Sequence, residues 1–342
     1  MIEDFLLWGT LIIVNITLIT KGEILLFNIV LLGTGGGMPM PNRFLSSMII
    51  SYKGRKILID CGEGTQVSMR NLKTGFKQID IICITHVHGD HIFGLPGLLS
   101  TIGNSSRIEP VTIIGPEGIA DVVNGLISSI SYFPYTINII ENPKNSLSIQ
   151  ILDNGMSIKD YTKKHSNNDI ILSTLDLEHS SPCLGYNFYI RRKPKFYPEK
   201  AELYQVPKKI WKRLQNGEVI IHNNKTYTPD MVLGEERKGI KLSYITDTRP
   251  VDKILNFINE SNLFVCEGTY GDNEDLDKAI KNKHMLFSEA AELARDGKVE
   301  ELLLTHFSPV MDEPQLYKLN AMNIFSNTVI GYDGFKKELN FT

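Results

Sequence analysis

The feature that most constrains this chain is residues 85–91, Thr-His-Val-His-Gly-Asp-His. The run overlaps the end of residues 79–85, whose apolar, β-branched composition is typical of a buried strand. Four side chains of metal-binding types therefore fall where a strand passes into a loop: His86, His88, Asp90 and His91. Because Gly89 permits a tight turn, the first two side chains can converge on one ion and the last two on another.

Three later residues extend this set, and each follows an apolar, strand-like run: His179, Asp247 and His306. Neutral imidazole and carboxylate suit zinc and similar divalent ions, and two neighbouring ions need about six or seven such ligands. Any one of the three alone is more often a loop or turn residue, so their weight comes from the joint pattern. The sequence predicts a site for two metal ions, and its ligands accept zinc, manganese or iron.

The composition fits one large α/β domain with a deep core or two smaller ones, with 342 residues, 42% hydrophobic and 22% charged. A net charge of -3 excludes an overall basic nucleic-acid binder but not a local basic patch. The four cysteines form no Cys-X-X-Cys pair, so neither a disulfide framework nor a thiolate zinc finger is expected. A reduced, cytoplasmic compartment is the default expectation.

Residues 1–26 form an apolar N-terminal extension. Their most apolar stretch, residues 5–20, is shorter than the ~20 residues of a spanning helix, and acidic residues precede it in place of a signal peptide's positive charges. Two interpretations stay open, an over-extended start and a membrane anchor, and we favour the first. The domain proper is expected over residues 27–342.

Short apolar runs bounded by turn residues predict strands at 27–33, 47–51, 56–60, 79–85, 111–114, 149–152, 170–177, 185–190, 241–246, 263–266 and 301–305. Helical spacing predicts helices at 116–130, 250–260 and 286–296, with another beginning near residue 93. Strand and helix signals recur in two successive blocks. This order suits a sandwich of two sheets covered by helices on both outer faces.

Residues 191–240 interrupt that pattern with a basic insertion. Between residues 191 and 213, nine basic residues oppose two acidic ones. The candidate RNA contacts there are Arg191, Arg192, Lys208, Lys209, Lys212 and Arg213. The aromatic residues interleaved with them are Phe196, Tyr197, Tyr204 and Trp211. Two interpretations stay open: an arm that binds phosphates and stacks on bases, or a solvated insertion whose aromatic rings pack back on the domain.

Residues 89–99, Gly-Asp-His-Ile-Phe-Gly-Leu-Pro-Gly-Leu-Leu, resemble the ribonuclease Z (tRNase Z) family of the metallo-β-lactamase superfamily, which removes the 3′ trailer of precursor tRNA. The resemblance covers about residues 27–333 and includes segments 32–35, 60–66, 115–116, 184–186, 246–250, 266–269 and 304–309. It implies an αββα four-layer sandwich with an inserted protruding arm, usually assembled as a homodimer.

The resemblance also implies the roles of individual residues. One zinc ion would be held by His86, His88 and His179, the other by Asp90, His91 and His306, with Asp247 bridging both. Asp90 would accept a proton from the attacking water. His284, oriented by Glu267, is the candidate proton donor to the departing 3′ oxygen. The implied reaction is two-metal hydrolysis of a phosphodiester that leaves a 3′-OH.

Several segments depart from the family's pattern. The arm segment 204–214 lacks the expected Gly-Pro, and the loop 38–44 differs from the usual Lys-Arg-Asn-containing form. Specificity for the tRNA elbow and discrimination of a CCA end are therefore not carried over. Cys266, Gly268 and residues 285–286 replace the family's His, Ala and Ser-Thr, but both catalytic groups remain.

The leading hypothesis is a zinc endonuclease that acts on the 3′ ends of precursor tRNA. The first rival is a small-molecule phosphodiesterase or other hydrolase on the same fold, which only the arm distinguishes by sequence. A non-catalytic RNA-binding protein with a relict site predicts that a ligand is missing, whereas all seven candidates are present. A membrane-tethered nuclease depends on residues 1–26.

Overall fold

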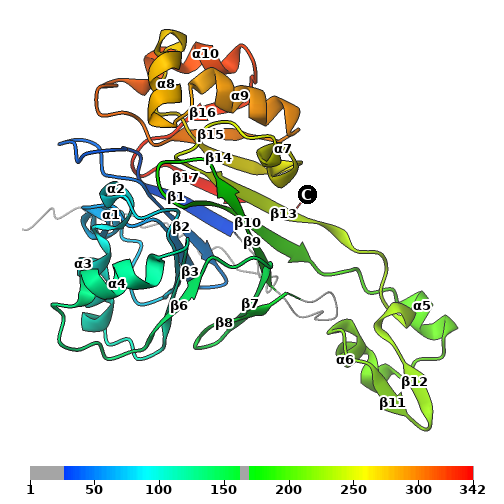
Figure 1. Ribbon diagram of the computed structural model, residues 1–342. Coiled ribbons are helices and arrows are strands. Elements are labelled where there is room, and N and C mark those ends of the chain that lie inside the picture. The colour runs from blue at the N-terminus through cyan, green and yellow to red at the C-terminus, as the bar shows by residue number, and fades with distance from the viewer. Residues whose placement is uncertain (1–26, 162–168, 342) are drawn as a thin grey trace, which may run out of the picture.

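Two stacked β-sheets with helices on both outer faces form the body of the protein, and a long arm projects from one end (Figure 1). The computed structural model describes residues 27–161 and 169–341. The N-terminal extension, with the anchor hypothesis attached to it, lies outside the described residues. Within the described ranges, no helix has the length and apolar character needed to cross a membrane.

The first sheet changes from antiparallel to parallel pairing along its width. Its strands are β1 (Phe27–Gly33), β2 (Ser47–Tyr52), β3 (Arg55–Ile59), β4 (Ile79–Cys83), β5 (Val111–Gly115), β6 (Ile137–Glu141) and β17 (Lys336–Leu339). Their order is β17-β1-β2-β3-β4-β5-β6, and the pairs from β3 to β6 are parallel. Parallel neighbours need crossover connections, which here contain α1 (Thr65–Asn71), α2 (Gly89–Ile92), α3 (Leu95–Asn104) and α4 (Ile119–Ile127).

The second sheet, like the first, has an antiparallel part and a parallel part. Its strands are β7 (Leu147–Leu152), β8 (Gly155–Asp160), β9 (Ile170–Leu177), β10 (Cys183–Arg192), β13 (Arg237–Ile245), β14 (Leu263–Glu267), β15 (Leu302–Thr305) and β16 (Thr328–Ile330). They follow the order β16-β15-β14-β13-β10-β9-β7-β8, with parallel pairing from β13 to β16. The crossovers contain α7 (Lys253–Ile258), α8 (Leu276–Asn282), α9 (Phe287–Asp296) and α10 (Lys318–Met322).

Three apolar layers hold the stack together. Side chains such as Ile57 and Tyr186 fill the space between the sheets. A second layer, with Leu98, lies between the first sheet and its helices, and a third, with Phe287, lies between the second sheet and its helices. The predicted four-layer αββα sandwich is therefore confirmed.

The arm lies between β10 and β13 and has a small apolar core of its own. It contains α5 (Pro198–Leu203), α6 (Trp211–Gln215), β11 (Ile220–His222), β12 (Lys225–Tyr227) and the short helical turns Lys208–Ile210 and Pro229–Met231. Its core residues are Ala201, Val206, Ile210, Leu214, Ile220, Tyr227, Val232 and Leu233.

Two of the four arm aromatics belong to this core. The rings of Phe196 and Trp211 lie 5.2 Å apart between centroids, and the Trp211 indole donates to the Val206 carbonyl. Tyr197 and Tyr204 stay 41% and 45% exposed. The packing interpretation therefore holds for the first two rings, although they pack on the arm itself and not on the main domain.

Arg107 is fully buried and connects the segments around β4 and β5 of the first sheet through its hydrogen bonds. Its guanidinium donates to the Asp80 carboxylate and to the backbone carbonyls of Lys77, Glu109 and Pro110. Removing one partner of a buried ion pair leaves charge and carbonyl groups uncompensated. Asp80 keeps its ion pair with Arg55, so the main loss is that of the hydrogen bonds from the Arg107 guanidinium. We therefore expect Arg107→Met to lower the free energy of unfolding by about 2–3 kcal/mol, measured by urea denaturation.

Arg295→Met is the matched control, because Arg295 forms an exposed pair with its neighbour Asp296 and has no other ion pair within residues 27–161 and 169–341. This control should unfold at the wild-type urea midpoint. If Arg107→Met also does so, the buried network does not stabilise the fold.

Candidate active site

The site lies where the parallel strands of both sheets end. Asp247, Glu267 and His306 come from the ends of β13, β14 and β15, which are parallel neighbours, so their side chains meet at one edge. His86 follows β4 of the first sheet, and the Leu184 amide donates to the Thr85 carbonyl, which joins the two edges. Ligands of α/β sheets commonly bind at such carboxyl ends.

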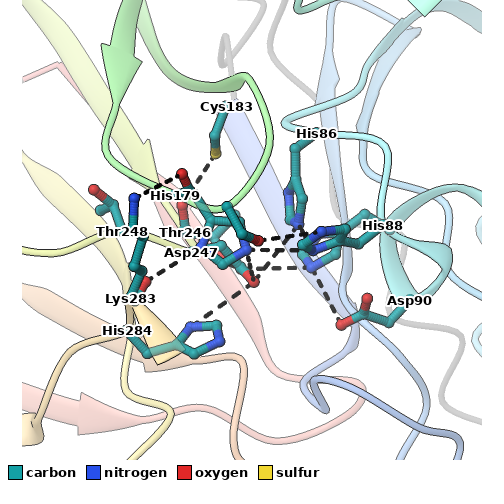
Figure 2. A network of polar contacts seen from close by, with 12 residues as sticks. His86, His88, Asp90, His179, Cys183, Thr246, Asp247, Thr248, Lys283 and His284 are labelled. Carbon is teal, nitrogen blue, oxygen red and sulfur yellow. Dashed lines mark hydrogen bonds and ion pairs between the residues drawn. The ribbon is translucent and has the colours of Figure 1, made fainter. Parts of the chain in front are cut away.

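Three imidazoles form the first ligand set, and Figure 2 shows them converging. The Nδ1 atom of His88 lies 3.0 Å from Nε2 of His86 and 3.3 Å from Nε2 of His179. His86 is fully buried, and α2 places His88 at its N-terminal cap. The structure thus brings together the three residues that the resemblance assigned to one ion.

The second set combines a carboxylate with two imidazoles. The Nε2 atoms of His91 and His306 lie 3.1 Å apart, and each is 3.4 Å from Oδ2 of Asp90. Both rings are buried, whereas Asp90 remains 11% exposed toward the surface. The residues assigned to the other ion are also close enough to share one.

Asp247 lies between the two sets. Its Oδ2 atom is 3.7 Å from Nε2 of His86 and 3.8 Å from Nε2 of His179. Its Oδ1 atom is 3.4 Å from Nε2 of His91 and 3.2 Å from Nε2 of His306. One carboxylate therefore presents a separate oxygen to each set, which is the geometry that a bridging ligand needs.

The outward-facing Nδ1 atoms of four of these rings have partners of their own. The partners are Thr85 Oγ1 for His86 at 3.1 Å, Asp60 for His91 at 2.8 Å, the Lys283 carbonyl for His179 at 3.3 Å and Thr269 Oγ1 for His306 at 3.0 Å. Such partners orient metal-ligating histidines and fix which nitrogen carries the proton. The converging nitrogen and oxygen donors therefore fit a pair of divalent metal ions.

Glu267 and His284 form a second pair beside the ligands. Glu267 is fully buried, and its carboxylate accepts hydrogen bonds from Nδ1 of His284 at 3.1 Å and from the amides of Thr248 and Met285. Burial lowers the pKa of His284, but the charge and hydrogen bond of Glu267 outweigh it and raise the pKa to about 9. Glu267 therefore fixes the Nδ1 side of this imidazole and favours its protonated form, and no residue in the described ranges hydrogen-bonds to Nε2.

Asp60 is a site residue whose role was not predicted from the sequence. It is fully buried, and its carboxylate accepts from the Thr85 amide and hydroxyl as well as from His91. Burial raises the pKa of this carboxyl, while the His91 charge opposes that change. An aspartate directly after the apolar run 57–59 was the available signal, because carboxylates commonly accept the second ring N–H of metal-ligating histidines.

A glycine loop covers the second ligand set. A Cβ atom on Gly36 would lie 2.4 Å from the His306 ring, so no larger residue fits there. Gly37 has a φ of +78° and donates its amide to Asp90 Oδ2 at 2.6 Å. The other oxygen of Asp90 has no hydrogen-bond or ion-pair partner among the described residues, and Asp90 lines the pocket.

The ligands form the floor of an open cavity of about 460 Å³. Its walls include the glycine loop and Ser308 on one side, and Tyr270 with the turn between α8 and α9 on the other. This volume is in the range of pockets that hold a single small-molecule ligand, so only a short part of a polymeric substrate fits inside. The rest of a polymeric substrate would therefore lie on the surface outside.

The six predicted RNA contacts do not join this cavity, because they lie on the arm or at its base (Figure 1). At the base, Arg191 pairs with Glu236, and Arg192 lies over the Phe341 ring. The other four are exposed on the arm: Lys208, Lys209, Lys212 and Arg213. Arg213 also pairs with Glu218.

Comparison with known proteins adds relatives over nearly the whole chain. Ribonuclease Z of Alkaliphilus oremlandii is 61% identical over 316 residues, which cover 92% of this chain and 99% of the relative. Ribonuclease Z of Clostridioides difficile is 56% identical with the same coverage. A family model described as Anti-Pycsar protein Apyc1 matches residues 27–232, and thus stops before Asp247.

Two solved structures share the fold. The short form of human tRNase Z is 24% identical with a TM-score of 0.61, covering 92% of this chain and 99% of its own. The metallo-β-lactamase fold protein YhfI of Bacillus subtilis is 16% identical with a TM-score of 0.62, covering 92% and 100%. These likenesses show the fold alone. From the curated relatives, however, it follows that the chain belongs to the ribonuclease Z family and is a metal-dependent hydrolase of the metallo-β-lactamase fold.

Proposed function

We propose that this chain is a cytoplasmic endoribonuclease that binds two zinc ions per subunit and removes the 3′ trailer of precursor tRNA. The observation that carries the proposal is the position of Asp247 between two complete ligand sets, beside a buried Glu267–His284 pair. The names of the relatives supply the class of substrate. A homodimer belongs to the same proposal and follows from the family resemblance.

Hydrolysis of a phosphodiester needs a nucleophile at neutral pH and compensation of charge on the phosphoryl oxygens. A pair of divalent ions supplies both when bound. The chain's residues must then accept one proton from water and donate another to the leaving oxygen, because a bond between phosphorus and the water oxygen forms while the bond to O3′ breaks. The products are a 3′-OH on the mature tRNA and a 5′-phosphate on the trailer.

Asp90 is placed to accept the proton from water. One carboxylate oxygen is held by the Gly37 amide, and the neighbouring imidazoles of His91 and His306 stabilise its negative charge. Burial opposes the charge, but these two partners keep the pKa of Asp90 below its ordinary value. The carboxylate thus stays ionised, and its second oxygen, which has no hydrogen-bond partner among the described residues, is available as the base.

His284 is placed to donate the proton to O3′. Glu267 holds Nδ1, so Nε2 presents the acidic hydrogen to the cavity. The His284 carbonyl accepts from Arg249 at 2.5 Å, and Arg249 itself forks onto Glu289. Arg249 and Glu289 therefore hold the backbone of His284 in place.

We expect Asp90→Ala to lower kcat for a precursor tRNA with a 3′ trailer by more than about 10³-fold, because the substitution removes the base and one ligand together. Single-turnover cleavage assays with added zinc or manganese measure the effect. Asp121→Ala, an exposed position on α4, is the control and should cleave as the wild type does. A nuclease that survives Asp90→Ala would contradict the assignment.

The same assay distinguishes the rival function. A wild-type protein that cleaves bis(4-nitrophenyl) phosphate but no precursor tRNA would be a small-molecule phosphodiesterase on this fold. A single cut after the last nucleotide of the mature acceptor strand supports the proposal.

His284→Ala provides an independent test, because its effect should depend on the leaving group. The ribose O3′ needs a proton to depart, whereas 4-nitrophenolate is stable without one. We expect kcat to fall by about 10²–10⁴-fold for precursor tRNA and by far less for bis(4-nitrophenyl) phosphate. Equal decreases on both substrates would show that His284 maintains the metal site and does not donate the proton.

The arm's part in binding can be tested without disturbing its core. Deleting the tip would remove Ile210 and Trp211, which pack on the arm core. A triple substitution of Lys208, Lys209 and Lys212 by Met removes charge alone. We expect KM for precursor tRNA to rise more than about tenfold. The slope of log K for binding against log salt concentration should become shallower by about one unit for each phosphate that is no longer bound.

The control for the arm is a triple Met variant at three exposed lysines of the main domain, Lys73, Lys77 and Lys298. It removes the same charge but should bind precursor tRNA more tightly than the arm variant. Equal KM values for the two variants would mean that the arm lysines contribute only to the overall charge.

A further inference from the structure

The turn between α8 and α9 forms one wall of the active-site cavity and carries two lysines. Lys281, Asn282, Lys283 and His284 all line the cavity at this wall. The carboxylates that line the cavity, Asp90 and Asp247, belong to the ligand sets on its floor. The wall that holds the proton donor is therefore also the positively charged side of the cavity.

The two lysines differ in how they are engaged. The Lys283 ammonium donates to the His179 carbonyl at 3.3 Å and lies 3.9 Å from the Glu178 carboxylate. Lys281 is exposed and has no hydrogen-bond or ion-pair partner among the residues that the structure describes. Its charge is thus free for an anion that approaches this wall.

The backbone that carries Lys281 is held in place. The α8 helix ends at Asn282, and its C-cap Lys283 adopts a left-handed conformation with a φ of 57°. The His284 amide donates to the Ala279 carbonyl at 2.9 Å. The Lys283 carbonyl accepts from His179, and the Asn282 side chain donates to the Tyr270 hydroxyl at 2.7 Å. The backbone of Lys281 is therefore held in place relative to the ligand sets, while its side chain extends from it.

The chemistry sets which part of an RNA passes this wall. In an in-line displacement, the leaving O3′ lies on the side of the group that protonates it, which is the side of His284. A nucleotide whose O3′ lies beside His284 and whose body extends over the end of α8 brings its own 5′-phosphate to this wall, whereas the trailer lies beyond the scissile phosphate.

We propose that Lys281 binds the phosphate on the 5′ side of the last nucleotide of the mature acceptor strand, and so positions O3′ against His284. The inference rests on the proposed function and adds a substrate-positioning residue to it. A purely structural role is the alternative, because a lysine in the last turn of a helix also stabilises the helix dipole.

The first experiment compares Lys281→Met with Lys278→Met. Lys278 lies on the same helix, but it pairs with Asp275 and does not line the cavity. We expect Lys281→Met to lower kcat/KM for precursor tRNA by about five- to tenfold more than for bis(4-nitrophenyl) phosphate, which has no second phosphate. For Lys281→Met, the slope of log K for tRNA binding against log salt concentration should become shallower by about 0.7, the value for one phosphate contact on a single strand. Lys278→Met should keep wild-type values.

A precursor tRNA in which one phosphate linkage is replaced by an uncharged methylphosphonate then identifies the phosphate that Lys281 binds. With this linkage on the 5′ side of the last mature nucleotide, the difference between wild type and Lys281→Met should shrink to less than about twofold, since the charge that the lysine binds is gone. With the linkage placed one position inside the trailer, the difference should persist. The reverse result would overturn the proposal, because Lys281 would then bind the trailer.

Two other outcomes would also overturn it. One is that Lys281→Met and Lys278→Met have equal effects on kcat/KM. The other is that Lys281→Met lowers the melting temperature enough to account for its loss of activity. Either result would show that Lys281 only stabilises α8. Failure of the proposed function is distinguishable, because the wild-type protein would then cleave no precursor tRNA at all.

Discussion

The carboxylate of Asp247 is the group on which the site depends. It is only 2% exposed, and a charge so deeply buried must be compensated by its surroundings. Burial raises the pKa of this carboxyl, but the imidazoles around it lower the pKa below its ordinary value, so it stays ionised. Because each of its oxygens faces one ligand set, the spacing between the sets is fixed by a single side chain.

Backbone strain contributes to this arrangement. Asp60, Asp247 and His306 each follow a strand, and each adopts a left-handed conformation, with φ between 50° and 58°. Such a conformation costs about 1–3 kcal/mol for a residue other than glycine and persists only where the surroundings enforce it. The enforcing contacts are those of the site, since Asp60 binds His91 and Asp247 binds the imidazoles. Strong local order is thus concentrated at the strand ends that carry the chemistry.

Much of the fold could be predicted from sequence, because apolar runs such as 27–33 and 170–177 match β1 and β9 at both ends. The helix predicted at 116–130 is shorter, Ile119–Ile127, because Gly118 is left-handed and starts it late. β6 was missed because it is an edge strand whose residues are half-exposed. The ligand pattern was visible in the spacing of residues 85–91, whereas the Asp60–His91 contact joins residues from different crossovers and has no local signature.

The arm core has a consequence for how the protein varies. Its eight core residues lie entirely within residues 201–233, and the chain enters and leaves through only two neighbouring strands, β10 and β13. Segments that are packed in this way open and close as separate cooperative units. The interior of the arm can therefore loosen, or its tip can change in sequence, without transmitting the change to the hydrolytic centre.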